Sequence, residues 1–149
     1  MDQNQKMLET IVENARLGAD ACDQLLKKCK DAQMRKELML ERDQFNAAGR
    51  DAEERLFAMG VHPRPKGPMA RMSMWMGMEM NTMMDHSAGH IAQMLIEGCT
   101  MGIVEMNKAR NSLKDADGDV TGIASRLVEC QQAAIERLKP FLCQKDMVK

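Results

Sequence analysis

The stretch LETIVENARLGADACDQLLKKC, residues 8–29, decides the fold class of this chain. Its apolar residues recur every three or four positions, while Glu9, Glu13 and Asp20 fall on the opposite face. A period of about 3.6 residues with one apolar stripe is typical of an amphipathic α-helix packed against a core. The stripe consists of Leu8, Ile11, Val12, Ala15, Ala19, Cys22, Leu25, Leu26 and Cys29. We therefore expect a first helix over about residues 5–29.

A second apolar stripe follows, but it is out of phase with the first. At about 100° per residue the two stripes lie roughly a third of a turn apart, so one straight helix cannot carry both. The chain must break near Lys30 to Ala32, where Asp31 can cap a new helix. The second stripe consists of Met34, Leu38, Phe45, Ala48, Ala52, Leu56 and Met59. The pattern predicts a helix over residues 32–59 that forms a tight antiparallel hairpin with the first.

The segment GVHPRPKGP, residues 60–68, is the clearest loop in the sequence. Its first glycine ends the second helix, and its prolines forbid a continuation. An apolar pattern then runs over residues 69–113 with little to interrupt it, and it predicts a single third helix. At about 1.5 Å per residue such a helix is roughly 65 Å long. It must therefore overhang the others or kink, with Gly77 and Gly89 as the expected kink points.

A run of aspartates and glycine over residues 115–119 ends the third helix. A fourth apolar stripe then predicts a helix over residues 119–142. The chain has 149 residues, which is near the common size of one domain, and it shows no internal repeat. We expect an all-α fold with one domain over residues 1–149: an antiparallel four-helix bundle with a long third helix.

Apolar residues also occupy the back of the predicted third helix, where an outer helix of a monomeric bundle should be polar. These residues are Trp75, Met78, Ile96, Ile103 and Val104. A helix that is apolar on both faces is expected to be buried on both faces. We therefore expect a homodimer in which this helix meets a second subunit about a two-fold axis. The alternative is a scatter of exposed apolar side chains, which is common at protein surfaces.

The charge balance disfavours several classes of partner. The chain has 21 Lys plus Arg and 22 Asp plus Glu, a formal net charge of -1, so it has no overall field that would attract nucleic acid or an anionic membrane. Its five cysteines include no CxxC pair, and its N-terminus has no apolar signal core, which favours a reduced, cytoplasmic protein. The longest weakly charged stretch, residues 86–101, falls short of the ~20 apolar residues of a membrane span.

A four-helix bundle invites comparison with di-iron carboxylate proteins, which carry Glu-x-x-His motifs on two inward-facing helices. No Glu-x-x-His motif occurs in this sequence. Glu41 and Glu105 do fall on predicted apolar seams, and two buried carboxylates can bind a metal. The alternative is that each carboxylate pairs with an arginine or faces water at an end of the bundle.

One flank of the predicted third helix combines methionines with a histidine. The chain has 17 methionines, and thioether together with imidazole is a ligand set that suits copper(I). Helical spacing places these residues on one side of the helix. The candidate ligands are Met83, His90, Met94, Glu97 and Met101. The alternative is ordinary core packing, because methionine fills irregular apolar space well.

Two runs in the sequence resemble a group of uncharacterised small helical proteins of clostridia and related Firmicutes. They are GPMARM, residues 67–72, and HIAQMLIEGCTMGI, residues 90–103, and the resemblance covers most of the chain. The opening Leu8-Glu9-Thr10 is also similar, more loosely, to that of ferritin-like bundle proteins of unknown function in bacteria. The resemblance implies a ferritin-like architecture in the cytoplasm of an anaerobic bacterium, and it implies no catalytic or cofactor-binding residue.

The sequence shows no evident pair of nucleophile and base, so no catalytic residue and no cofactor are predicted. Three hypotheses of function remain. The first is a non-enzymatic helical bundle that associates with itself as an interaction or stress-associated module. The second is a copper(I)-binding protein that uses His90 and its neighbouring methionines. The third is a di-metal oxidase rebuilt around Glu41 and Glu105, although two carboxylates fall short of the usual ligand count.

Overall fold

The computed structural model describes residues 2–62 and 70–146, and for residues 70–72 it describes the backbone alone. The described chain is all-α, which confirms the fold class predicted from apolar periodicity. Its helices are α1 (Gln3–Lys28), α2 (Ala32–Ala58), α3 (Ala70–Thr82), α4 (Ala88–Ser112) and α5 (Gly118–Leu138), followed by a 3₁₀ turn at Lys139–Phe141. None of these helices is both long and apolar enough to cross a membrane.

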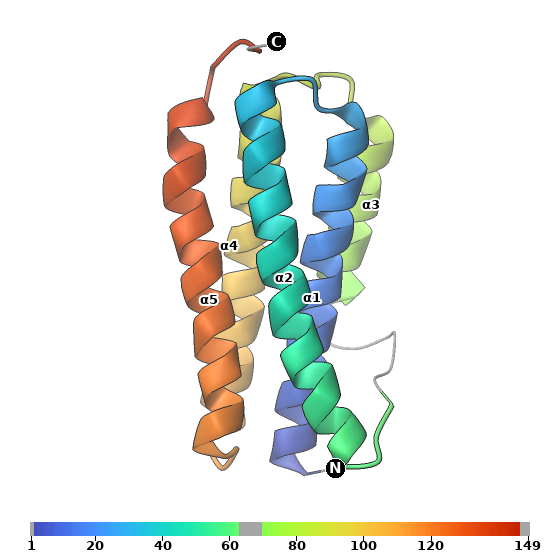
Figure 1. Cartoon of the computed structure of the whole chain (residues 1–149), viewed down its shortest axis with the longest axis vertical. Coiled ribbons are helices and arrows are strands. Elements are labelled where there is room, and N and C mark those ends of the chain that lie inside the picture. Colours follow the sequence, from blue (N-terminus) through green and yellow to red (C-terminus); the bar gives the residue numbers. More distant parts are fainter. Residues whose placement is uncertain (1, 63–69, 147–149) are drawn as a thin grey trace.

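The four long helices α1, α2, α4 and α5 lie side by side, and the shorter α3 lies next to them (Figure 1). α1 and α2 form one antiparallel hairpin, and α4 and α5 form another. In the sequence, α3 stands between the two hairpins. It runs antiparallel to α2, so the following α4 runs in the same direction as α2. α1 packs against α4 and α5, α2 packs against α5, and α3 lies against α1 and α4. The packed interior therefore lies among the four long helices.

The turn between α1 and α2 lies where the phase shift predicts it. Asp31 is the N-cap of α2, and its side chain accepts a hydrogen bond from the N–H of Met34 at 2.8 Å. Arg35 donates from Nη1 to the carbonyl oxygens of Leu26 and Cys29 at 2.6 and 3.0 Å. These side chains satisfy backbone groups that the two helix ends leave unpaired. A short, well-capped turn thus fixes the hairpin.

The prediction of one third helix over residues 69–113 is wrong for the described part of that range; residue 69 lies outside the described residues. α3 and α4 are separate helices, and the chain between them is not helical. Ser87 caps α4 by accepting a hydrogen bond from the N–H of His90 at 3.3 Å, and Asp85 accepts one from the N–H of Ser87 at 2.9 Å. These local acceptors compete with helical hydrogen bonding and start a new helix.

The helix is not interrupted at Gly77 or Gly89, the expected kink points. Gly77 lies within α3, and Gly89 lies in the first turn of α4. Gly89 has a different role, because a Cβ there would lie 2.9 Å from the backbone nitrogen of Cys143. The C-terminal segment packs against the start of α4, where the Asp146 side chain accepts a hydrogen bond from the N–H of Ala88 at 2.6 Å.

Because the chain reverses between α3 and α4, part of the apolar back face is covered within one molecule. The ring of Trp75 lies over Gly98 of α4, 3.6 Å from where a Cβ of that residue would stand. The members of this face that are partly buried against the core are Trp75, Ile96 and Ile103. Met78 and Val104 remain exposed. The back face therefore does not by itself require a second subunit.

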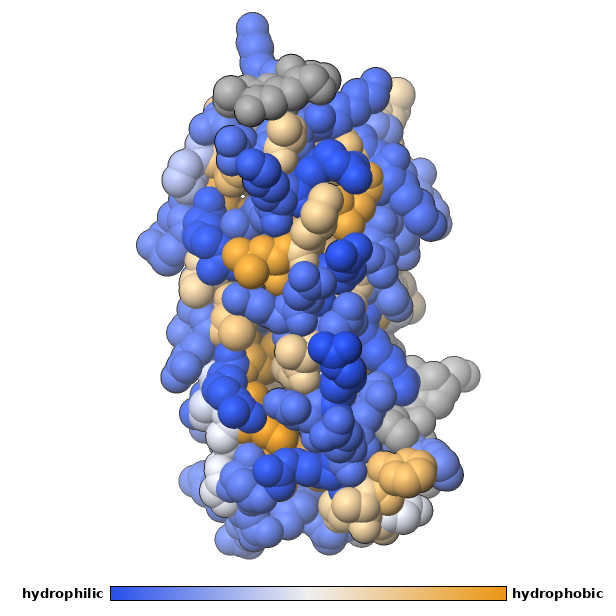
Figure 2. Space-filling model, viewed as in Figure 1, coloured by the Kyte–Doolittle hydropathy of each residue, from blue (hydrophilic) through white to orange (hydrophobic). Residues whose placement is uncertain are grey.

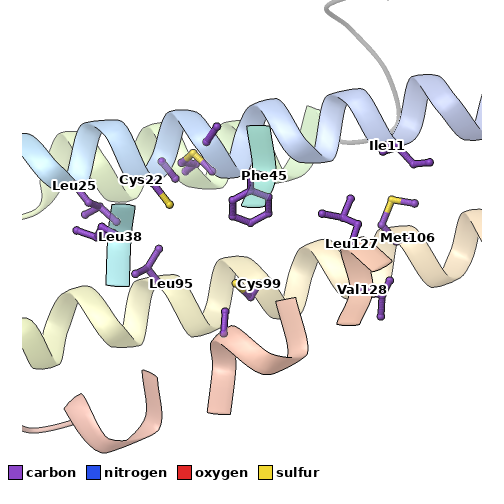
Figure 3. Packing of buried hydrophobic residues seen from close by; sticks show 14 of the residues in the cluster. Ile11, Cys22, Leu25, Leu38, Phe45, Leu95, Cys99, Met106, Leu127 and Val128 are labelled. Carbon is purple, nitrogen blue, oxygen red and sulfur yellow. The ribbon is translucent and has the colours of Figure 1, made fainter. Parts of the chain in front are cut away.

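The core is aliphatic and rich in sulfur, with Phe45 as its buried aromatic ring (Figure 3). Phe45 reaches from α2 toward α1, where a Cβ at Gly18 would lie 2.5 Å from the ring. Cys22 from α1 and Cys99 from α4 point into the same interior (Figure 3). The close approach of α1 and α2 thus depends on a residue without a side chain at Gly18.

Candidate functional site

Several buried polar side chains lie where α2 and α5 meet. Most buried residues are apolar, but Glu37, Glu41 and Gln131 are buried there, and Asn14 reaches the same region from α1. Arg137 of α5 lies half-buried beside them. Burial of polar or charged groups is unfavourable unless each group finds a partner. The partners therefore decide what these residues do.

Glu37 and Arg137 form an ion pair across the contact between α2 and α5. Nε of Arg137 lies 3.0 Å from both carboxylate oxygens of Glu37. Nη2 is also 3.0 Å from Oε2, but it is too poorly aligned for a hydrogen bond. The hydrogen bond to Glu37 raises the pKa of Arg137, so the guanidinium stays charged. The Arg137 guanidinium is therefore paired with Glu37.

Glu41 lies one turn after Glu37 on α2 and has a different environment. It is 1 % exposed, and neither carboxylate oxygen accepts a hydrogen bond from a donor group among the described residues. Burial is the largest cause that raises the pKa of Glu41 to about 9; the hydrogen bond with Glu37 and the charge of Glu37 follow, and Arg137 opposes them with a smaller effect. At neutral pH Glu41 is therefore a neutral carboxylic acid, which can donate a hydrogen bond to Glu37 where a second carboxylate could not.

Gln131 belongs to a series of buried hydrogen bonds that links α5, α1 and α4, which we call the polar chain. Its Nε2 donates to Oδ1 of Asn14 at 3.0 Å, and Nδ2 of Asn14 donates to the carbonyl oxygen of Gly102 at 3.0 Å. Glycine is required at this point, because a Cβ on Gly102 would overlap Nε2 of Gln131. In the described part of the chain, Oε1 of Gln131 has no partner. The polar chain therefore ends at an unpaired oxygen.

A small cavity between α2 and α5 is bordered by Glu41 and Gln131. Its volume is about 10 Å³, which is room for about one water molecule. The other lining residues are Gln44, Phe45, Cys130 and Ala134. The surface of this cavity is apolar, so the buried oxygens of Glu41 and Gln131 do not open onto it.

A second cavity lies under α3, bordered by α1 and α4. Its volume is about 30 Å³, and its walls are almost wholly apolar. Four sulfur-bearing residues contribute to these walls: Met76 and Met80 from α3, and Met94 and Cys99 from α4. We call this space the sulfur-lined cavity. α3 closes it from outside.

The buried thiols of Cys22 and Cys99 are protonated. Burial raises the pKa of both, and the nearby Glu41 carboxyl raises it further. A thiol is a much poorer nucleophile and metal ligand than a thiolate. Both cysteines thus behave as small apolar residues of the core unless a metal ion displaces the proton.

The five residues of the predicted copper(I) flank lie in different environments. Met83 is in the connection between α3 and α4, and His90 is in the first turn of α4; both are half-buried. Glu97 is exposed, and Met101 is half-buried. Met94 is buried and lines the sulfur-lined cavity, whereas the other four do not. The flank therefore shares one residue with the interior.

The two carboxylates of the di-metal hypothesis are placed differently. Glu41 is in the interior, whereas Glu105 is half-buried on α4, with Nζ of Lys108 3.6 Å from its carboxylate. In the part of the chain that the structure describes, no group of three or more His, Cys, Asp or Glu side chains is arranged to hold a metal ion. The structure thus brings no such set of ligands to Glu41.

The sequence pattern places Glu41 on an apolar seam, but the sequence analysis does not identify Glu37, Gln131 or Arg137. Gln131 stands four positions after Leu127, where the stripe of α5 calls for an apolar residue. A polar residue inside an apolar stripe is the signal that would have identified it. Glu37 and Arg137 give no such signal, because a pair 100 positions apart depends on tertiary packing.

Comparison with known proteins gives no match to a protein-family model, to a curated protein or to a solved structure. What the interior and the surface can do follows from their own geometry.

Proposed function

We propose that this protein is a non-enzymatic interaction module that associates with a second copy of itself through the outer face of α3. The observation that carries the proposal is a row of exposed methionines. Met74 is 68 % exposed, Met78 one turn later is 64 % exposed, and Met84 just after the helix is 94 % exposed. Met76 and Met80 on the inner face are buried. α3 is thus apolar on both sides and exposed on one.

A second copy of the chain is the occupant that suits this face. Unbranched methionine side chains adapt to one another, so the same row can pack against itself across a two-fold axis. The net charge of -1 gives no strong attraction to an oppositely charged partner. The 13 residues of α3 span about 20 Å, so each subunit buries much less than the ~800 Å² of a standard interface. We expect a weak, reversible dimer.

The face formed by α2 and α5 offers no comparable surface. Figure 2 shows its hydrophobic residues as separate spots among hydrophilic ones. Scattered apolar residues of this kind are normal at protein surfaces. This difference favours α3 as the contact.

Sedimentation velocity over a range of protein concentrations tests the proposal. We expect the sedimentation coefficient to rise with concentration for the natural sequence and to stay at the monomer value for Met74→Glu with Met78→Glu. The control is Met39→Glu with Leu40→Glu, two exposed apolar residues of α2, which should behave like the natural sequence. Monomers at every concentration, or equal association of the two double variants, would refute the proposal.

We also propose a ferritin-like architecture for this module, with a stress-associated role in the cytoplasm. The course of the chain supports the architecture. Two antiparallel hairpins are joined by one long connection, as in ferritin-like bundles (Figure 1). Quantitative proteomics of the native cells before and after oxidative stress tests the role, and an unchanged abundance would argue against it.

A second candidate function, copper(I) binding, is favoured by the sulfur-lined cavity. Met76, Met80, Met94 and Cys99 offer thioethers and one thiol, which are donors that copper(I) prefers. A volume of about 30 Å³ is too small for an organic ligand but suits a single ion that draws the side chains inward. A bound ion would displace the Cys99 proton or use the thioethers alone.

Anaerobic loading with copper(I), followed by metal analysis, tests this candidate. We expect about one equivalent of copper to be retained by the natural sequence and lost in Met80→Leu with Met94→Leu. Met74→Leu with Met78→Leu makes the same change on the exposed face and should retain it. His90→Ala separates the interior set from the flank, because it weakens binding only if the flank holds the ion. No retained copper, or equal loss in both double variants, would exclude the interior set.

A further inference from the structure

The methionines of α3 and of the connection after it differ strongly in their exposure to solvent. Met74 and Met78, four positions apart, are 68 % and 64 % exposed, and Met84 is 94 % exposed. Met76 and Met80 carry the same thioether on the inner face of α3, where they are 7 % and 5 % exposed. Among the other methionine side chains that the structure describes, none is more than 41 % exposed. An oxidant in solution therefore reaches the three outer thioethers most easily.

A methionine thioether reacts with a hydroperoxide, ROOH, without first losing a proton. A sulfur lone pair attacks the terminal oxygen, so an S–O bond forms while the O–O bond breaks. The other oxygen leaves with the electron pair of the O–O bond and takes up the proton of the transferred oxygen as ROH, which is water when R is hydrogen. Sulfur loses two electrons, and the peroxide gains them. The product, methionine sulfoxide, is reduced again by methionine sulfoxide reductases.

Oxidation has different consequences on the two sides of α3. A sulfoxide is polar, and water solvates it at an exposed position such as Met74 or Met78. The same oxygen on Met76 or Met80 would lie in the apolar wall of the sulfur-lined cavity, where burial without a donor is costly. The outer methionines can therefore be oxidised while the core of the fold stays intact.

We propose that Met74, Met78 and Met84 are an oxidation site for hydroperoxides, and that their conversion to sulfoxides prevents two copies of the chain from associating. This inference rests on the self-association proposed above, because the same three side chains form that contact. A row of sulfoxides would lose its hydration on association without gaining hydrogen-bond donors. Since the expected dimer is weak, monomers expose the site to the oxidant. Self-association is then lost under oxidising conditions and restored by enzymatic reduction.

Brief treatment with tert-butyl hydroperoxide, followed by peptide mass spectrometry, tests the site itself. We expect Met74, Met78 and Met84 to gain one oxygen about tenfold faster than Met76 and Met80, in line with their exposed fractions. Protein unfolded in urea is the reference, because all methionines should react at similar rates there. Equal rates at the outer and inner methionines of the folded protein would overturn the proposal.

Sedimentation velocity of treated and untreated protein tests the effect on association. We expect oxidation to raise the Kd of the dimer by about tenfold or more, and methionine sulfoxide reductase to restore it. The variant with leucine substitutions Met74→Leu, Met78→Leu and Met84→Leu keeps an apolar face and all five cysteines, so it should associate equally before and after treatment. Met39→Leu with Met59→Leu changes two exposed methionines of α2 and its C-cap, and it should remain sensitive to the oxidant.

The two proposals fail in different ways. Untreated protein that stays monomeric would refute self-association and its regulation together, whereas the oxidation rates of the single methionines would still decide the site. Untreated protein that associates, and does so equally after the outer methionines are oxidised, would overturn the regulation alone. Loss of association on treatment of the triple leucine variant would assign the effect to another group, such as the exposed thiol of Cys143, and would also overturn the proposal.

Discussion

Glu37 and Glu41 are identical side chains one turn apart on α2, yet they have different partners. Glu37 has Nε of Arg137 at 3.0 Å from both of its oxygens. Glu41 has no such partner among the described residues, and its pKa rises to about 9. Burial is the largest cause of this rise, and the Arg137 guanidinium, which pairs with Glu37, opposes it only in part. Sequence patterns place Glu41 on a buried seam, but they cannot assign its charge because the partner is set by tertiary packing.

Glu41 makes the stability of the protein depend on pH. Its folded-state pKa of about 9 lies above the ordinary value of 4.5, so the native state loses stability as the pH rises between these values. Glu41→Gln removes this loss. We expect the variant to be about 3 kcal/mol more stable than the natural sequence at pH 7 and equally stable near pH 4. Urea unfolding at the two pH values measures the difference.

Glu54→Gln is the control for this prediction, because Glu54 is exposed on the same helix. It should change the free energy of unfolding by less than about 0.5 kcal/mol at either pH. If Glu41→Gln gave the same stability difference at both pH values, the carboxyl would not be the buried neutral acid described above.

Gly102 marks the closest approach of α4 to the polar chain. A Cβ there would overlap Nε2 of Gln131, which Asn14 holds in place. We expect Gly102→Ala to lower the free energy of unfolding by about 1–3 kcal/mol, although alanine is the better helix former. Gly122→Ala on α5, where an added Cβ meets nothing within 4 Å, should instead raise it by up to about 1 kcal/mol. Chemical denaturation of both variants measures these changes, and equal effects would disprove the steric argument.

At the scale of the elements, periodicity predicts α1 and α2 well but not the division between α3 and α4. The bounds of α1 and α2 lie within two residues of the predicted ones. The third segment is apolar around much of its circumference, so its pattern has no phase shift that marks the break. The break is local and polar, because Asp85 and Ser87 accept backbone hydrogen bonds there. A capping pair of this kind can be read from the sequence, but the continuous apolar pattern around it predicts an uninterrupted helix.

Ser87 should therefore matter more than an ordinary surface serine. Removal of the N-cap by Ser87→Ala leaves the N–H of His90 without its acceptor, and we expect a loss of about 1 kcal/mol in the free energy of unfolding. Amide hydrogen exchange at His90 should also become faster. Ser73→Ala, at an exposed position of α3, is the matched control and should be neutral. Unchanged stability and exchange in Ser87→Ala would mean that another interaction starts α4.

At the scale of the whole molecule, α3 separates the interior from an exposed apolar surface. Its inner residues Met76 and Met80 close the sulfur-lined cavity, and its outer residues Met74 and Met78 are exposed. The sequence indicates a segment with two apolar faces, and it predicts that the second face meets another subunit in a homodimer. In the structure part of that face packs within the same chain, because the chain reverses after α3 (Figure 1). This reversal depends on contacts with α1 and α4 that no local pattern reports.

The proposed contact between two copies of the chain lies on the outer face of α3. Methyl NMR of protein labelled at the methionine methyl groups tests it most directly in a dilution series, because methionines occur in α1, α2, α3 and α4. We expect the methyl signals of Met74, Met78 and Met84 to shift with concentration, while the signal of Met39 on α2 stays constant. Signals of the three α3-side methionines that stay unchanged from the lowest to the highest concentration would contradict the claim.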